Sequence, residues 1–296
     1  MDWETIVQLL FASFQTGSIY ALVALSYVVI LNATGILNFA QGECLMLGAM
    51  AGVALLVGAR LPYPVMFVAA IAVVALLSVL SERMVVRPLV RRGAPLIALI
   101  LVLLGVMMVF RHATGLILGK RPQFAEAPFG LEPIKLTSSL LILPQTIFIY
   151  LTVALVFLAI WFFFERTRVG MMVKIVGIDA EAARLVGVNM ELVTVLAFAA
   201  GGAIAAIGGL LMAPLSAASF YMGLTPGVKG FVAMVIGGVG SPVGALLGGI
   251  VLALVETLAA SYLSSAYADG IAFLVLLLML FFRPAGIMGS LASEGR

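Results

Sequence analysis

Long apolar runs separated by short polar segments dominate this chain. A helix that crosses the hydrocarbon core of a membrane, about 30 Å thick, needs about 20 mostly apolar residues. Runs of about this length recur over the first two thirds of the sequence. The expected spans are residues 6–31, 38–57, 64–81, 95–110, 140–164 and 192–212.

The pattern becomes less regular after Met212. Residues 229–239 are apolar but reach only about half a membrane thickness, whereas residues 243–260 are long enough to cross. Residues 270–282 form a last, short run whose helix is expected to start a few residues earlier. We interpret residues 229–239 as a short or re-entrant element. The sequence therefore predicts an all-α, polytopic transmembrane helical bundle of about eight to nine membrane segments, with residues 1–296 forming a single domain.

Composition places the chain in the same class. Hydrophobic residues make up 64% of it and charged residues only 10%, which is typical of a polytopic membrane protein and not of a soluble enzyme. The single cysteine, Cys44, lies inside an apolar run. One cysteine builds neither a disulfide framework nor a cysteine-rich metal site, so we expect Cys44 to be a small buried hydrophobic residue and expect no metal site.

Basic residues in short loops predict the orientation in the membrane. One group lies between the third and fourth spans and consists of Arg83, Arg87, Arg91 and Arg92. A second group lies between the fifth and sixth spans and consists of Arg166, Arg168, Lys174 and Arg184. Two crossings separate these loops, so both are expected on the cytoplasmic side, with the N-terminus outside. The C-terminal tail is inside if residues 229–239 cross and outside if they re-enter, and we favour the inside.

Polar side chains at membrane depth form the first candidate site. Residues 45–57 alone are too few to cross, so the second span extends back and carries Asn38, Gln41 and Glu43 into the membrane. An intramembrane acid normally faces the bundle interior. These side chains either line a substrate pathway or gate, with Phe39 as an apolar gate, or hydrogen-bond a broken backbone near the interface. Glu256, near one end of its span, is expected to have a structural partner or to snorkel to the interface, and not to bind a ligand.

Glycine at four-residue spacing is the second pattern. Such ladders allow helices to approach closely, and they occur at Gly240, Gly244 and Gly248 and again at Gly201, Ala205 and Gly209. We interpret them as packing within one subunit, with a subunit interface as the alternative. The glycines at 237–240 lack the following lysine of a phosphate-binding loop, so phosphate binding is not expected. His112, beside Arg111 at a predicted helix end, is expected to be interfacial.

A polar stretch at residues 166–189 interrupts the apolar pattern and is predicted to be a cytoplasmic loop. It contains a short amphipathic helix, residues 179–187. Asp179 and Glu181 suit the positive N-terminal end of this helix, and a small apolar side is formed by Ala182, Leu185 and Val186. A small helix of this kind in a chain that is otherwise nearly all membrane indicates mechanical contact with a soluble partner. A surface helix without a partner is the alternative.

Taken together, several motifs resemble the branched-chain amino acid permease family of bacterial ABC importers. They are NFAQGE at residues 38–43, EAARLVGVN at 181–189, GF through GGVGS at 230–241, and RPAGIMG at 283–289. Each is weak alone, but their order and spacing cover nearly the whole chain. The sequence is most similar to the shorter of the two permeases that such systems pair.

The resemblance implies a permease subunit in the bacterial inner membrane and not an enzyme. Its implied partners are a second, paralogous permease, two cytosolic ATPase subunits, a periplasmic substrate-binding protein and membrane lipid, with no nucleic acid. No cofactor is expected on this chain, because ATP and Mg would bind the ATPase subunits. The helix that would couple to the ATPase consists of Asp179, Glu181, Ala182, Ala183, Arg184, Leu185, Val186 and Gly187.

The sequence departs from the family at Gln41, where many relatives carry histidine, so a titratable gate is not expected there. The coupling segment also matches only half of the broader importer loop signature. The expected substrates are branched-chain or related amino acids, although the family also includes importers of urea, short amides and aromatic acids. A passive channel or facilitator is the alternative from another class. A membrane enzyme is poorly supported, because no nucleophile, base and oxyanion-stabilising set converges in the sequence.

Overall fold

The computed structural model describes residues 3–130, 132–135, 141–185 and 187–289. Its first half contains α1 (Trp3–Thr34), α2 (Gln41–Val53), the π-helical turn η1 (Ala54–Gly58), α3 (Tyr63–Ser81), a second π-helical turn η2 (Glu82–Val86), α4 (Arg87–Arg91) and α5 (Leu96–Ile117). A two-stranded hairpin follows, β1 (Ile134–Lys135) and β2 (Leu141–Ile142). The second half contains α6 (Pro144–Arg166), α7 (Arg168–Ile178), α8 (Ala180–Leu185), α9 (Met190–Met212), α10 (Leu224–Gly237), α11 (Pro242–Tyr262), the 3-10 turn η3 (Ser265–Tyr267) and α12 (Ala268–Phe282).

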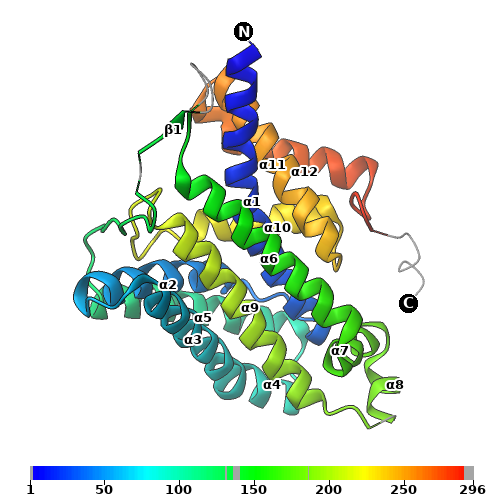
Figure 1. Cartoon of the computed structure of the whole chain (residues 1–296). Coiled ribbons are helices and arrows are strands. Elements are labelled where there is room, and N and C mark those ends of the chain that lie inside the picture. Colours follow the sequence, from blue (N-terminus) through cyan, green and yellow to red (C-terminus); the bar gives the residue numbers. More distant parts are fainter. Residues whose placement is uncertain (1–2, 131, 136–140, 186, 290–296) are drawn as a thin grey trace.

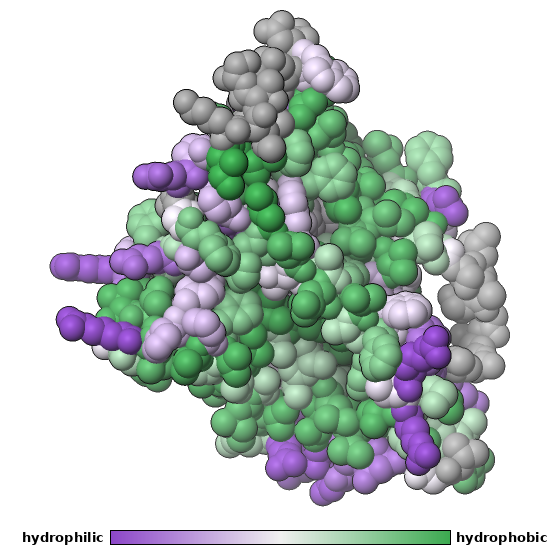
Figure 2. Space-filling model, viewed as in Figure 1, coloured by the Kyte–Doolittle hydropathy of each residue, from purple (hydrophilic) through white to green (hydrophobic). Residues whose placement is uncertain are grey.

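The predicted helical membrane bundle is confirmed. Among the described residues, eight helical stretches are long and apolar enough to cross a membrane. Apolar side chains cover most of the face shown in Figure 2, and hydrophilic side chains gather at its edges. The ninth apolar helix, α10, has 14 residues. It begins at Leu224, so the prediction that this element starts at Lys229 is wrong, and Lys229 lies inside the helix.

The predicted boundaries of the third, fourth and fifth spans are also wrong. The third span does not end before the arginines, because η2 and α4 continue it as one helical stretch, Tyr63–Arg91. The fourth span continues beyond Phe110 to Ile117, and therefore contains polar residues that an apolar count leaves out. The fifth span, helix α6, begins only at Pro144, where proline suits the first helical turn. Residue 140 lies outside the described residues.

The second span starts at Gln41, three residues later than predicted. Asn38 forms a turn before it, in which its side-chain Oδ1 accepts a hydrogen bond from the Ala40 N–H at 3.1 Å. The preceding helix ends at Gly35, whose φ of 68° suits glycine. The start of α2 therefore packs against the start of α10, where Gly42 contacts Gly223 and Gly227.

Helix α1 is the central element, and its middle is almost completely buried. Its neighbours are α9, α10 and α11. In Figure 1, α2, α3 and α5 group on one side of α1, and α11 and α12 lie on the other. Small residues allow these close contacts, since Gly249 of α11 packs on Ala21 and Gly230 of α10 packs on Val23. Cys44 is buried, as expected.

The predicted glycine ladders lie at contacts inside this chain. Gly201 packs against Ile30 of α1, and Gly209 against the backbone of α2. Gly244 and Gly248 pack against the backbone of α10. Gly240 is not part of a ladder, because it lies in the loop before α11 with a φ of 87°. These contacts leave the four helical glycines unavailable for an interface with another subunit.

Gly209 provides a test of this packing. A Cβ added there would lie 1.9 Å from the Leu45 carbonyl oxygen, so Gly209→Ala must push α2 and α9 apart. We expect a loss of about 1–3 kcal/mol of stability, measured as a lower unfolding temperature of the purified protein in detergent. Gly105→Ala is the control, since nothing lies within 4 Å of its added Cβ. Equal unfolding temperatures for the two variants would contradict the packing argument.

One end of the bundle collects the predicted cytoplasmic segments. The Asn32 Nδ2 at the end of α1 donates to the Gly240 carbonyl oxygen at 2.7 Å, just before α11 starts. The tail returns to the same end, where the N–H groups of Ile287 and Met288 donate to the carbonyl oxygens of Ile236 and Gly237 at 2.9 and 2.8 Å. The tail therefore lies at the end of the bundle that carries α7, as expected if α10 crosses.

Candidate functional site

Glu43 lies in the first turn of α2, with its side chain almost fully buried. Its Oε1 accepts a hydrogen bond from Arg111 Nε at 3.0 Å, and Arg111 Nη2 forms an ion pair with the same oxygen. Because α5 continues to Ile117, Arg111 and His112 are not at a helix end as predicted. Sequence reasoning missed this partnership. The signal in the sequence was the acid itself, since a carboxylate at membrane depth is normally paired with a nearby cation.

Glu43 also borders a cavity of about 170 Å³ between α1, α2, α5 and α10. Its walls are mainly apolar and include Tyr27, Phe39, Leu104, Met107, Leu224, Val228 and Phe231. Three of these rings form a cluster, with centroid distances of 6.5 Å between Tyr27 and Phe39, 6.2 Å between Tyr27 and Phe231, and 5.6 Å between Phe39 and Phe231. Edge-to-face and tilted contacts of this kind stabilise the wall by more than the apolar area that they bury.

The structure brings two of the four predicted pathway residues to this cavity, Phe39 and Glu43. Asn38 is buried in the turn before α2, where its side chain accepts a hydrogen bond from the Ala40 N–H. Gln41 is completely buried, and neither its Oε1 nor its Nε2 has a hydrogen-bond partner among the described residues. The cavity therefore combines a half-buried aromatic ring, Phe39, with one buried carboxylate.

A second charged cluster connects α1, α10, α11 and α12. The Tyr20 hydroxyl donates to Glu256 Oε2 at 2.9 Å, and Lys229 forms an ion pair with the other oxygen of Glu256. Lys229 also pairs with Asp269 at 2.8 Å. Glu256 thus has structural partners, the role expected for it from its position near a span end.

The segment between α6 and α9 is built from short helices with side-chain caps. Thr167 Oγ1 accepts from the Gly170 N–H at 3.0 Å and starts α7, and Asp179 Oδ1 accepts from the Ala182 N–H at 3.0 Å and starts α8. Asn189 Oδ1 caps α9 in the same way at 3.1 Å. Caps of this kind satisfy backbone N–H groups that have no partner inside the helix. The polar residues of this segment therefore define where each helix begins.

Helix α8 is shorter than the predicted 179–187 helix. Asp179 is its cap, and it ends at Leu185 because Gly187 takes a left-handed φ of 81°. The N–H groups of Gly187 and Val188 donate back to the carbonyl oxygens of Arg184 and Ala183 at 3.1 and 3.0 Å, the pattern of a Schellman end. Both ends of this six-residue helix are thus fixed by local hydrogen bonds.

The side chains of α8 divide into an inner and an outer set. Ala183 is completely buried, whereas Ala182 and Arg184 are exposed and Leu185 is 89% exposed. The predicted apolar side included Val186, which lies outside the described residues, as does the side chain of Glu181. Of the apolar side chains that the structure describes there, Leu185 is the large one presented outward.

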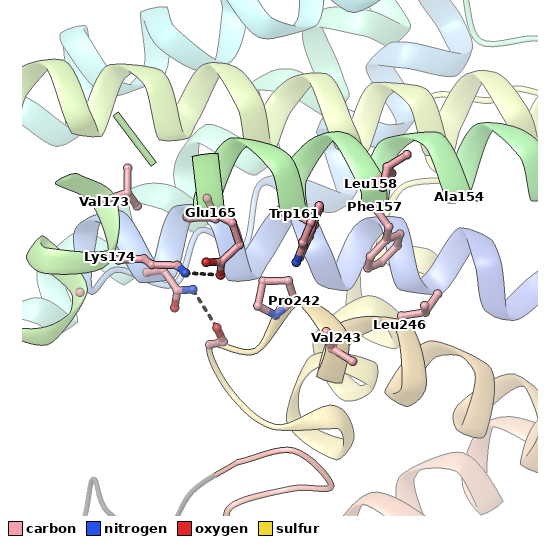
Figure 3. A pocket seen from close by; sticks show the side chains of 14 residues that line it. Ala154, Phe157, Leu158, Trp161, Glu165, Val173, Lys174, Pro242, Val243 and Leu246 are labelled. Carbon is pink, nitrogen blue, oxygen red and sulfur yellow. Dashed lines mark hydrogen bonds and ion pairs between the residues drawn. The ribbon is translucent and has the colours of Figure 1, made fainter. Parts of the chain in front are cut away.

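Two cavities lie beside this segment. One, of about 770 Å³, is lined by α6, α7 and the start of α11, and Figure 3 shows Trp161 and Phe157 on one side and Val243 and Leu246 on the other. The Glu165–Lys174 ion pair crosses its edge. The other, of about 640 Å³, lies between α1, α4, α7, α8 and α9 and includes Arg184 in its lining. The α7–α8 segment therefore has unfilled space on two sides.

Ion pairs hold the start of α9 to α4 across the second cavity. Arg87 binds both carboxylate oxygens of Glu82 at 3.0 Å and also pairs with Glu191 at 3.0 Å. Arg91 pairs with the same Glu191. A guanidinium held by both oxygens of a carboxylate has a defined orientation, so Arg87 links η2 firmly to the helix that follows α8.

Residues 9–280 match a family model described as the branched-chain amino acid transport system / permease component. The chain belongs to this family. The permease is 32% identical to the high-affinity branched-chain amino acid transport system permease protein LivH of Escherichia coli (strain K12), over 96% of this chain and 95% of that protein. It is 32% identical to the corresponding permease protein BraD of Pseudomonas aeruginosa, over 92% of each chain. A more distant similarity, 28% over 82% of this chain and 75% of the other, is to the ribose import permease protein RbsC of Escherichia coli (strain K12).

The resemblance inferred from the sequence motifs is therefore confirmed. With eight membrane-length helices in the part of the chain that the structure describes, and with permease relatives, the protein is a multi-pass membrane transport protein. Its relatives LivH and BraD are named as transport-system permease proteins.

Proposed function

We propose that this permease is the membrane subunit of an ATP-driven importer that moves branched-chain or related amino acids across the bacterial inner membrane. Its proposed partners are a paralogous permease, two cytosolic ATPase subunits that bind ATP and Mg, and a periplasmic binding protein. The observation that carries the proposal beyond family membership is α8, a short helix capped at both ends that presents Leu185 outward. A soluble ATPase could engage such a helix as a rigid contact.

A chain of contacts supports mechanical transmission from α8 to the Glu43 cavity. The α7 residue Gly177 packs against the Asn32 carbonyl oxygen, since an added Cβ would lie 2.7 Å from it. Asn32 lies in the last turn of α1, and the next turn leads to Phe39 and Glu43. A displacement of α7 and α8 would therefore reach the cavity through the end of α1. The unfilled space on both sides of α7 would give this displacement room.

The cavity supports an apolar substrate better than the polar alternatives. Urea and short amides have little apolar surface to bury against its walls. An aliphatic side chain suits the same walls. Leu224 and Val228 at its border are partly exposed, and the second permease would cover them by packing against this face.

Purification with partners tests the proposal. The chain would be co-expressed with its neighbouring genes, purified through a tag on it, and the co-purifying chains identified by mass spectrometry. The complex would then be placed in liposomes together with the binding protein. We expect uptake of labelled leucine with ATP and none with a non-hydrolysable analogue. Equal uptake in both conditions would favour a passive facilitator.

A further inference from the structure

The carboxylate of Glu43 uses only one of its two oxygens for protein contacts. Oε1 binds Arg111, whereas Oε2 is buried and has no hydrogen-bond partner in the part of the chain that the structure describes. A buried charged acceptor without a partner carries a large desolvation cost. The arrangement is therefore incomplete, and a donor from a ligand would complete it.

Space is available for such a ligand. Glu43 borders the cavity of about 170 Å³, which equals the share of about six molecules of liquid water at about 30 Å³ each. This is room for a molecule of about the size of an aliphatic amino acid. A Cβ at position 223 would lie 2.9 Å from Glu43 Oε2, so a larger residue at this position would press against the free oxygen.

Charge narrows the class of ligand. The Glu43–Arg111 pair is neutral as a unit, and the remaining cavity walls carry no ionised side chain among the described residues. A ligand with a net charge would be left uncompensated in this apolar space, whereas a zwitterion brings no net charge. The free oxygen is an acceptor, so the group that meets it must be a donor.

We infer that Glu43 Oε2 accepts a hydrogen bond from the ammonium group of a zwitterionic aliphatic amino acid whose side chain packs against Phe39 and Phe231. Arg111 is the positioning residue that holds the carboxylate in place. This inference rests on the proposed function and adds to it a recognition element in the permease itself. The permease would then discriminate against molecules of the same shape that lack an amino group.

The inference is tested by direct binding to the purified complex of both permeases and the ATPase subunits, without the binding protein. Titrations followed by saturation-transfer NMR would compare leucine with 4-methylpentanoate, which is leucine without its amino group. A hydrogen bond to a buried charge corresponds to about tenfold or more in affinity. We therefore expect leucine to bind the wild type at least about tenfold more tightly than 4-methylpentanoate.

Variants locate the effect. Glu43→Gln keeps the size of the side chain and should lower leucine affinity about tenfold. The anion 4-methylpentanoate should not bind this variant more weakly, because Arg111 keeps its positive charge. Glu256→Gln is the matched control, because it also neutralises a buried, cation-paired carboxylate in a helix but borders no part of this cavity. It should leave leucine binding unchanged. Val228→Phe, which narrows the cavity without changing its charge, should weaken both ligands.

The outcomes separate the two levels of the argument. Absence of ATP-dependent uptake by the wild-type complex in liposomes contradicts the proposed function. ATP-dependent uptake together with equal binding of the two ligands by the wild type overturns only the inference about Glu43. Unchanged leucine affinity in folded Glu43→Gln overturns it as well. The wild-type comparison needs no variant, so the test holds even where a variant fails to fold.

Discussion

Leu185→Asp should reduce ATP-driven uptake at least tenfold while the permease remains folded and assembled in the membrane. Leu185 is 89% exposed on α8 and makes little contribution to the buried core, so the substitution has little effect on folding. An aspartate there would place an unpaired charge in the proposed contact with the ATPase, where desolvation of the charge is costly. Uptake and ATP hydrolysis would be measured in the same liposomes. We expect hydrolysis to lose its stimulation by the loaded binding protein.

The control for this variant is Leu263→Asp. Leu263 is 70% exposed and lies between α11 and η3, at the opposite end of the bundle. It has the same chemistry and similar exposure but no place in the proposed coupling surface. Uptake by this control should remain near the wild-type rate. If Leu185→Asp transports as fast as Leu263→Asp, α8 is not the coupling contact.

Arg111→Met should produce the largest loss of stability. It leaves the carboxylate of Glu43 buried beside an apolar cavity without its cation. Removing one partner of a buried ion pair costs about 3–5 kcal/mol, because the remaining charge is uncompensated. The measurement is the unfolding temperature of the purified protein in detergent, together with the amount that reaches the membrane.

Pairing the substitution with Glu43→Gln separates charge from packing. The double variant removes both charges and should recover most of the lost stability, because an uncharged pair has no unpaired ion to desolvate. It should not recover leucine discrimination, since the acceptor charge is gone. Arg92→Met serves as the control for loss of an arginine at an exposed position and should unfold like the wild type. A double variant no more stable than Arg111→Met would show that Arg111 stabilises the fold by packing.

Much of the architecture could be predicted because it depends on local properties. Membrane helices satisfy their own backbone hydrogen bonds, so apolar length alone locates most of them. The predicted boundaries were wrong where polar residues continue a helix, as at Arg111 in α5 and at Arg87 in α4. An apolar count stops at the first charge, whereas a helix continues when another element supplies the counter-charge. Glu43 does this for Arg111, and Glu191 of α9 does it for Arg87 and Arg91.

The candidate site was predicted only in part for the same reason. Glu43 could be placed at membrane depth from the length of its span, but its cation lies 68 positions away on another helix. Gly240 fits a four-residue ladder in the sequence, yet α11 begins only at Pro242. The capping residue Asp179 was placed correctly at the start of a short helix, although the helix ends two residues earlier than expected.

The sequence by itself therefore determined the helical membrane class, most of the spans, the family and the presence of a short helix between α7 and α9. These features depend on length, composition and local capping, which act over a few turns of chain. Only the tertiary structure decided that Arg111 neutralises Glu43, that Lys229 serves both Glu256 and Asp269, and that the glycines of α9 and α11 are occupied inside this chain. Those contacts join residues far apart in the sequence, and they depend on how the helices pack around α1 and not on any local pattern.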